Sequence, residues 1–178
     1  KKELKGTELR GKYLGIIGLG NIGKRLGRLA RALNMNIIGY DVVPIDEEFS
    51  KEVGLMKADL NTLLQSSDYI SIHVPLLDST YHLLDEQKMS TMKNTAKIIN
   101  TSRGGVVDED ALYNAIKNGT LGGAALDVFE KEPAIGSKLA ELDNVILTPH
   151  IGAQTKEAQS LAANVIAEKI VQILRGVI

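Results

Sequence analysis

The sequence predicts an α/β protein with a doubly wound parallel sheet in a single domain. Predicted strands and helices alternate along the whole chain, which is typical of parallel sheets covered by helices on both faces. A glycine-rich turn with the spacing G-x-G-x-x-G joins the first strand to the first helix. Candidate ligand-binding residues stand at or just past strand ends, where such sheets bind ligands: Gly18, Asp41, Pro75, Arg103, Asp127 and His150.

The first strand is an apolar run over residues 13–19, and it leads into the glycines of a Rossmann-type fingerprint. Gly18 permits the tight turn, Gly20 lets a pyrophosphate approach the backbone, and Gly23 lets the helix pack closely on the strand. Free N–H groups and the helix dipole favour an anion at this helix start. The alternative is a glycine-rich turn without a ligand.

The first helix and second strand complete the fingerprint. Apolar residues recur at helical spacing after the turn, at Ile22, Leu26, Leu29, Ala30 and Leu33. The second strand, residues 36–40, ends at Asp41, 18 residues beyond Gly23. This is near the distance of about 20 expected for a carboxylate that binds the adenosine ribose.

The remaining elements follow in order. We expect a short helix through Phe49 and Val53, and a helix over Leu60–Leu64 capped by Asp59. The later elements are strand 69–74 ended by Pro75, helix 85–92, strand 96–100, a helix from Asp108 to Asn118, strand 121–126, strand 144–147 and an amphipathic helix over 156–174.

Composition narrows the function. The 178 residues suit one domain, and 21 basic against 22 acidic residues give no electrostatic case for nucleic acid or an anionic membrane. The absence of cysteine excludes disulfides and thiolate catalysis. The three histidines lack metal-ligand spacing, so no metal is expected. With no membrane span or signal peptide apparent, we expect a cytoplasmic protein, and the first residue, Lys1, suggests a fragment of a longer chain.

Arg103, Glu132 and His150 are the candidates for chemistry. Arg103 can bind a carboxylate bidentately, or be an ordinary surface arginine. His150 can exchange a proton near neutral pH, or cap the last helix. A carboxylate such as Glu132 beside it would orient the imidazole and favour its protonated form, whereas the alternative is simple solvation.

Three further polar residues have a cofactor-binding or a structural interpretation. Asp127 ends a strand of small residues against which a nicotinamide ring can lie, or else it caps a turn. His73 is expected to line the cofactor side of its strand end, and His82 is interpreted as structural.

Six blocks of sequence resemble the D-isomer-specific 2-hydroxyacid dehydrogenases, in the order found in that family. The blocks are Gly18-x-Gly20-x-x-Gly23, Asp41, His73-Val74-Pro75-Leu76, Asn100-Thr101-Ser102-Arg103-Gly104, Ala125-Leu126-Asp127-Val128-Phe129-x-x-Glu132-Pro133 and Thr148-Pro149-His150-Ile151-Gly152. The resemblance runs from about Gly6 to the C-terminus. It implies that residues 1–178 are the family's NAD-binding domain, without its substrate domain.

The resemblance assigns roles to these residues. It implies that Arg103 binds the substrate's carboxylate and carbonyl, that His150 exchanges the proton, and that Glu132 pairs with His150. NAD would be bound by Gly18, Gly20, Asn21, Ile22, Gly23, Asp41, His73, Val74, Pro75, Thr101, Ser102, Arg103, Asp127, His150, Gly152 and Ala153. The charge of Asp41 would repel the extra phosphate of NADP.

The substrate and the assembly are implied less directly. The segment 150–159 is similar to that of the family members that act on D-3-phosphoglycerate, while glyoxylate, hydroxypyruvate and D-lactate remain alternatives. The resemblance also implies a homodimer through this domain, and little turnover without the substrate domain. Two other hypotheses are an NAD-sensing scaffold of the same fold and an unrelated nucleotide-binding domain.

Overall fold

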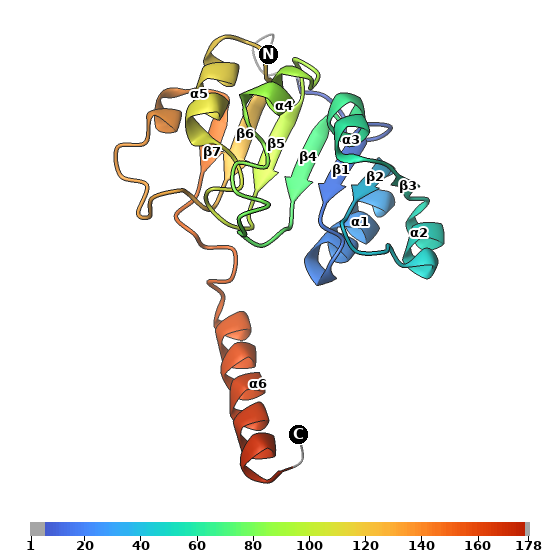
Figure 1. The fold of residues 1–178 in the computed structure, drawn as a ribbon, viewed down its shortest axis with the longest axis vertical. Helices are drawn as coiled ribbons and strands as arrows, with labels where there is room; N and C mark the ends of the chain where they lie inside the picture. The colour runs from blue at the N-terminus through green and yellow to red at the C-terminus, as the bar shows by residue number, and fades with distance from the viewer. Residues whose placement is uncertain (1–5, 177–178) are drawn as a thin grey trace.

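A computed structural model describes residues 6–176 and contains one seven-stranded parallel sheet in the order β3-β2-β1-β4-β5-β6-β7 (Figure 1). The strands are β1 (Tyr13–Ile17), β2 (Asn36–Tyr40), β3 (Met56–Lys57), β4 (Tyr69–Ile72), β5 (Lys97–Asn100), β6 (Gly123–Leu126) and β7 (Val145–Leu147). The helices are α1 (Asn21–Ala32), α2 (Glu47–Val53), α3 (Leu60–Ser66), α4 (Glu86–Ser90), α5 (Glu109–Lys117), the 3-10 helix η1 (Lys138–Glu141) and α6 (Lys156–Leu174). The predicted doubly wound sheet is confirmed.

The order of strands reverses at β1. The chain runs outward from β1 through β2 to β3, then returns to place β4 on the other side of β1. The carboxyl ends of β1 and β4 therefore border a crevice, which is where doubly wound sheets bind their ligands. Gly18 and His73 stand at these two ends, and the His73 N–H donates to the Ile17 carbonyl at 2.7 Å.

Two apolar clusters cover the sheet. The larger cluster contains β4, β5 and β6 side chains together with residues of α3, α4 and α5, including the fully buried Leu63, Leu84 and Leu112. The smaller cluster packs α1 and α2 on the opposite face of β1 and β2, around the fully buried Ile16 and Phe49. Burial of these side chains from water is the main force that holds the layers together.

Helix α1 packs on the sheet through small residues. Its buried residues are Gly23, Gly27 and Ala30, whereas most of the apolar stripe seen in the sequence is exposed. The exposed fractions of that stripe are 66% for Ile22, 65% for Leu29 and 54% for Leu33. A Cβ on Gly27 would lie 2.9 Å from Cζ of Phe49, so close packing selects the glycine side of the helix.

Helix α6 stands apart from the sheet and projects away from it (Figure 1). Within the described part of the chain none of its 19 residues is buried. Its bounds match the prediction from the sequence, but its apolar side chains, among them Leu161, Ile166 and Ile170, have no covering layer there. None of the helices in residues 6–176 combines the length and apolar content needed to cross a bilayer.

Local capping explains several helix starts. Asp59 accepts a hydrogen bond from the Thr62 N–H, and Asp108 accepts one from the Ala111 N–H at 2.9 Å, as predicted. Strand β2 has its predicted bounds, and the other predicted strands are one or two residues shorter in the structure. Strand β3 and η1 were not predicted, because two to four residues carry too little periodicity.

Candidate functional site

The glycine turn between β1 and α1 leaves no room for side chains at two of its positions. Gly18 has a φ of +91°, and a Cβ there would lie 2.6 Å from the His73 carbonyl oxygen. A Cβ on Gly23 would lie 2.1 Å from the Gly18 carbonyl oxygen. A Cβ on Gly20 would meet no described atom within 4 Å. The turn is therefore tight on its protein side and open at Gly20.

The N-terminus of α1 is suited to an anion. Its N-cap is Gly20, so no side chain among residues 6–176 caps the helix there, and its first turn contains no acidic residue. Asn21 and Ile22 are exposed. Unpartnered N–H groups and the positive end of the helix dipole favour a phosphate at this position. The residues present therefore fit the pyrophosphate of a dinucleotide.

Asp41 lies beside the same turn, at the end of β2. Its Oδ2 accepts a hydrogen bond from the Leu19 N–H at 2.7 Å, and its Oδ1 accepts one from the Val43 N–H at 3.0 Å. A cavity of about 240 Å³ opens between Asp41, Gly20 and the segment 43–46. A carboxylate held at the edge of this cavity is placed to accept hydrogen bonds from ribose hydroxyls.

His73 occupies the other side of the crevice and is half-buried. Its Nε2 lies 2.9 Å from Oγ of Ser71, and burial lowers the pKa of His73. The imidazole is thus held neutral near pH 7. Val74 is partly buried against Gly18, whereas Pro75 is exposed at the rim.

Asn100, which the sequence reasoning did not single out as a functional residue, shapes the loop after β5. It is only 2% exposed, and its Nδ2 donates to the Arg103 carbonyl at 3.0 Å. Its Oδ1 accepts hydrogen bonds from the N–H and the hydroxyl of Ser102, at 3.0 and 2.8 Å. A buried amide at the end of a strand, followed by a Ser and a Gly-rich turn, is the sequence signal for a loop held by such side-chain hydrogen bonds.

Arg103 and Thr101 are both exposed on this loop, which Asn100 holds by hydrogen bonds. Its Nη1 donates to the neighbouring Ser102 carbonyl at 2.6 Å. Among residues 6–176 its guanidinium forms no ion pair with a carboxylate. The charge is therefore available to an anionic ligand.

Asp127 is buried and holds the turn that follows β7. It accepts hydrogen bonds from Oγ1 of Thr148 at 2.5 Å and from the N–H groups of Ile151 and Gly152, both at 2.8 Å. Burial alone would raise the pKa of Asp127, but these three donors outweigh it and hold that pKa below the usual value. Its contacts are those of a turn cap, and they fix the turn that includes Gly152 and Ala153.

Glu132 and His150 meet across the end of the sheet. Nδ1 of His150 lies 2.8 Å from Oε2 of Glu132, and Oε1 of Glu132 accepts the Phe129 N–H at 3.2 Å. The hydrogen bond from His150, followed by that from Phe129, lowers the pKa of Glu132. Because Nδ1 is engaged, Nε2 is the ring nitrogen left to exchange a proton with a ligand.

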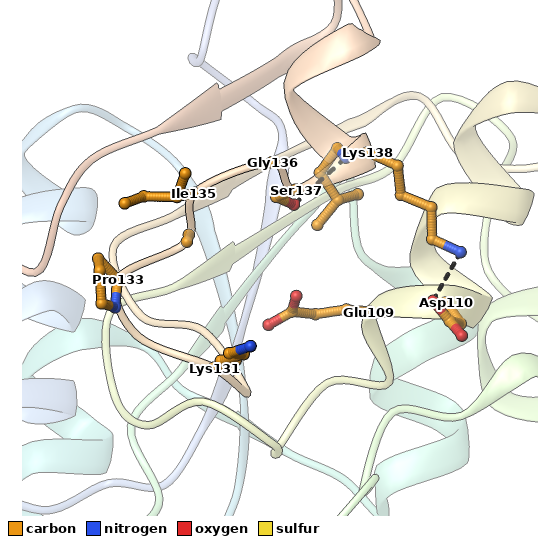
Figure 2. A pocket seen from close by; sticks show the side chains of 10 residues that line it. Glu109, Asp110, Lys131, Pro133, Ile135, Gly136, Ser137 and Lys138 are labelled. Carbon is orange, nitrogen blue, oxygen red and sulfur yellow. Dashed lines mark hydrogen bonds and ion pairs between the residues drawn. The ribbon is translucent and has the colours of Figure 1, made fainter.

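Two cavities flank the loop that carries Glu132. One of about 570 Å³ is lined by Glu132, His150, Pro149 and the apolar Phe129 and Ile135. The other, of about 320 Å³, lies between the start of α5 and residues 131–139, and Glu109 points into it (Figure 2). Burial raises the pKa of Glu109.

The polar loops all leave from the edge of the sheet that the carboxyl ends of the strands form. Arg103 follows β5, Asp127 follows β6 and His150 follows β7, and these strands are parallel. The cradle formed by Gly18, Gly20 and Asp41 follows β1 and β2 at the same edge. The arrangement can hold a dinucleotide along the crevice and present an acid–base pair and a cation beyond it.

Comparisons with known proteins agree with this geometry. Residues 1–152 match the family model described as D-isomer specific 2-hydroxyacid dehydrogenase, NAD binding domain. A D-3-phosphoglycerate dehydrogenase of Methanocaldococcus jannaschii is 48% identical over 177 residues, which cover 99% of this chain and 34% of that protein. A hydroxypyruvate reductase of Thermotoga maritima is 47% identical over 173 residues, which cover 96% of this chain and 55% of that protein.

A solved structure shows the same fold. The D-lactate dehydrogenase of Aquifex aeolicus, complexed with NAD and lactic acid, matches with a TM-score of 0.89 and 37% identity, covering 98% of this chain and 56% of that one. The chain thus spans between a third and just over half of the length of these relatives.

Proposed function

Because this chain belongs to the D-isomer specific 2-hydroxyacid dehydrogenase family, as an NAD-binding domain, we propose that the full-length protein interconverts a D-2-hydroxyacid and a 2-oxoacid with NAD. The observation that carries this proposal is the His150–Glu132 pair on the edge of the sheet where the exposed Arg103 also lies. Bound NAD supplies the site for hydride transfer to or from the carbon that bears the oxygen.

The residues of this chain supply binding and proton transfer. The Arg103 guanidinium binds the substrate carboxylate and polarises the adjacent carbonyl. Nε2 of His150 gives a proton to the carbonyl oxygen during reduction and removes it from the hydroxyl during oxidation. Glu132 holds the imidazole by Nδ1 and so leaves Nε2 as the nitrogen that exchanges the proton.

The cradle for NAD is assigned by its shape and charge. The free N–H groups of Asn21 and Ile22 bind the pyrophosphate next to the open Gly20, and Asp41 accepts the ribose hydroxyls. The residues that would surround the nicotinamide half are Thr101, Ser102, Asp127, His150, Gly152 and Ala153. The other residues proposed to contact NAD are His73, Val74, Pro75 and Arg103.

The proposed substrate is D-3-phosphoglycerate, which places the enzyme in serine biosynthesis. The support is the 48% identity to a D-3-phosphoglycerate dehydrogenase and the similarity of segment 150–159. The 47% identity to a hydroxypyruvate reductase supports the alternative of a hydroxypyruvate or glyoxylate reductase, and D-lactate is a further alternative. An assay of the full-length protein against these acids decides between them.

We further propose that residues 1–178 act as one NAD-binding domain within a longer chain that also carries a substrate domain. The exposed apolar side chains of α6 support this, since such surfaces are usually covered. Closure of two domains would exclude water from the site. The isolated domain is then expected to bind NAD but turn over poorly.

The assembly and the location are proposed as well. We propose a homodimer formed through this domain, with the stripe Ile22, Leu29 and Leu33 supporting an additional apolar contact. Sedimentation of the full-length protein tests the dimer. A dehydrogenase that draws on NAD for amino-acid synthesis would act in the cytoplasm.

His150→Ala in the full-length protein tests the proposed chemistry. Loss of general acid–base catalysis is expected to lower kcat by about a hundredfold or more, with the Kd for NADH within twofold of wild type. Turnover close to wild type with normal NADH binding would sink the proposal. The turnover of each acid in the panel, including 3-phosphoglycerate, is measured with the wild type and with His150→Ala.

A further inference from the structure

We infer that His82 is a positioning residue that fastens together the loops carrying Arg103 and Glu132, an inference that rests on the proposed function. Its ring lies between two carboxylates from different parts of the chain. Nε2 of His82 lies 3.1 Å from Oε1 of Glu130, and Nδ1 lies 3.5 Å from Oδ2 of Asp108. One imidazole therefore bridges the loops after β5 and β6 from the loop after β4.

The backbone of His82 makes the first of these connections. Its N–H donates to the Gly105 carbonyl at 2.7 Å, two residues beyond Arg103. The Leu84 N–H then donates to the Val106 carbonyl, and the Asp108 N–H donates to the Leu84 carbonyl, both at 3.1 Å. These three backbone hydrogen bonds hold the β4–α4 loop alongside the loop that carries Arg103.

Glu130 makes the second connection. Its Oε1 also accepts the Glu109 N–H at 3.1 Å, and its own N–H donates to Oε1 of Glu109 at 2.6 Å. Glu130 precedes Glu132 by two residues, so the loop that orients His150 is tied to the start of α5. The two loops are also in direct contact, since a Cβ on Gly104 would lie 1.8 Å from the Phe129 carbonyl oxygen.

The conformation of His82 indicates that these contacts hold it in place. Its φ is +47°, in the left-handed region that a side chain with a Cβ seldom adopts. The Tyr81 ring stacks on the imidazole with centroids 4.0 Å apart and planes at 15°. Residues kept in sparsely populated backbone regions need surroundings that over-determine them.

The contacts of His82 with Asp108 and Glu130, here called the clasp, matter for the reaction because of the residues that lie next to them. Arg103 and Glu132 each lie two residues from an anchored position. In the proposed function Arg103 binds the substrate, and Glu132 holds the His150 imidazole that exchanges the proton. Small misplacements of catalytic groups cost large factors in rate. Both ring nitrogens of His82 already face a carboxylate, which favours a clasp over a metal ligand.

The test uses three variants of the full-length protein. His82→Phe keeps a ring against Tyr81 but removes both nitrogens, and His82→Arg supplies a guanidinium whose N–H groups can bridge two carboxylates. Lys138→Gln is the matched control, because it breaks the 2.7 Å ion pair with Asp110 at the same helix start without touching the clasp (Figure 2). Steady-state kinetics and deuterium uptake of segments 101–107 and 129–133 are measured.

We expect His82→Phe to lower kcat/KM for the 2-oxoacid by about tenfold or more, with the KM for NADH within twofold and faster deuterium uptake in both segments. His82→Arg should recover most of the loss, and Lys138→Gln should match wild type. Unchanged kinetics in His82→Phe with only a lower Tm would overturn the inference. If His82→Phe fails to fold, Glu130→Gln replaces it with the same expectations. If the wild type oxidises or reduces none of the acids, the proposed function fails, while the deuterium uptake still tests the clasp itself.

Discussion

The Nδ1 atom of His150 lies 2.8 Å from Oε2 of Glu132, although 18 residues and strand β7 separate the two along the chain. His150 reaches this position with a φ of +54°, at a turn held by Asp127 through Ile151 and Gly152. The imidazole of His150 is therefore positioned by two carboxylates, one that contacts its ring and one that fixes the backbone beyond it.

Glu132→Gln in the full-length protein is expected to lower kcat by about a hundredfold, the lower range for general acid–base catalysis. The amide can still occupy the position, but it presents no negative charge to the ring of His150. The hydrogen bond from His150 lowers the pKa of Glu132. Glu132 therefore stays ionised, and the pair stays intact, at a more acidic pH than the ordinary pKa of a glutamate would permit. Its contribution is present above the usual pKa and is lost as pH falls through the lowered one.

A kcat–pH profile measures this effect. Glu47→Gln, which breaks the exposed pair with Lys57 at the far end of the sheet, is the control and should keep the wild-type profile. A Glu132→Gln enzyme with wild-type kcat across the range would contradict the assignment.

Asp41→Ala is expected to narrow the preference for NADH over NADPH. The carboxylate at the end of β2 repels the extra phosphate of NADPH, so the wild type should bind NADPH much more weakly. Removal of the charge should weaken the binding of NADH and leave the binding of NADPH unchanged. Fluorescence titration of both dinucleotides gives the ratio of Kd values, and equal affinities in the wild type would end this interpretation.

Gly23→Ala and Gly20→Ala separate packing from binding. The added methyl at position 23 would lie 2.1 Å from the Gly18 carbonyl oxygen, so we expect the free energy of unfolding to fall by about 1–3 kcal/mol. The methyl at position 20 meets no described atom, so stability should stay near wild type while NADH affinity falls. Equal stability losses in urea unfolding would argue against this distinction.

Asp127→Asn is expected to lower the free energy of unfolding near pH 7 by about 1.5–3 kcal/mol, the range for hydrogen bonds to a charged group. The carboxylate is buried and accepts three hydrogen bonds. Because the folded state holds the pKa of Asp127 below its usual value, its contribution is complete above the usual value of about 3.9 and is lost as pH falls further.

Unfolding curves of wild type and Asp127→Asn at several pH values measure this linkage. Their difference should shrink in acid, and the exposed Asp78→Asn should match wild type throughout. A difference that stays constant down to pH 2 would show that shape, and not charge, is what Asp127 contributes.

Local signals account for what could be predicted. The glycine turn and the capping residues Asp59 and Asp108 act through neighbours within a few positions, so the sequence alone places the helix starts. The carboxyl ends of parallel strands meet at one edge, which is why residues as distant as Asp41 and His150 were grouped correctly at that edge.

Contacts between loops could not be predicted in the same way. His82 was interpreted only as structural, because its partners Asp108 and Glu130 are 26 and 48 residues away and no periodicity links them. The face that α1 presents to the sheet was also missed. Hydrophobicity favours its leucines, whereas the close approach of helix and sheet selects Gly23 and Gly27.

Strand β7 has only three residues, forms one edge of the sheet and is the last strand made. Chains emerge from the ribosome N-terminus first and begin to fold as they do so. Gly20 and Asp41 are thus synthesised more than a hundred residues before His150. During synthesis the residues that would hold a dinucleotide are therefore made well before the imidazole that would use one, and both take their places when the domain folds as a unit.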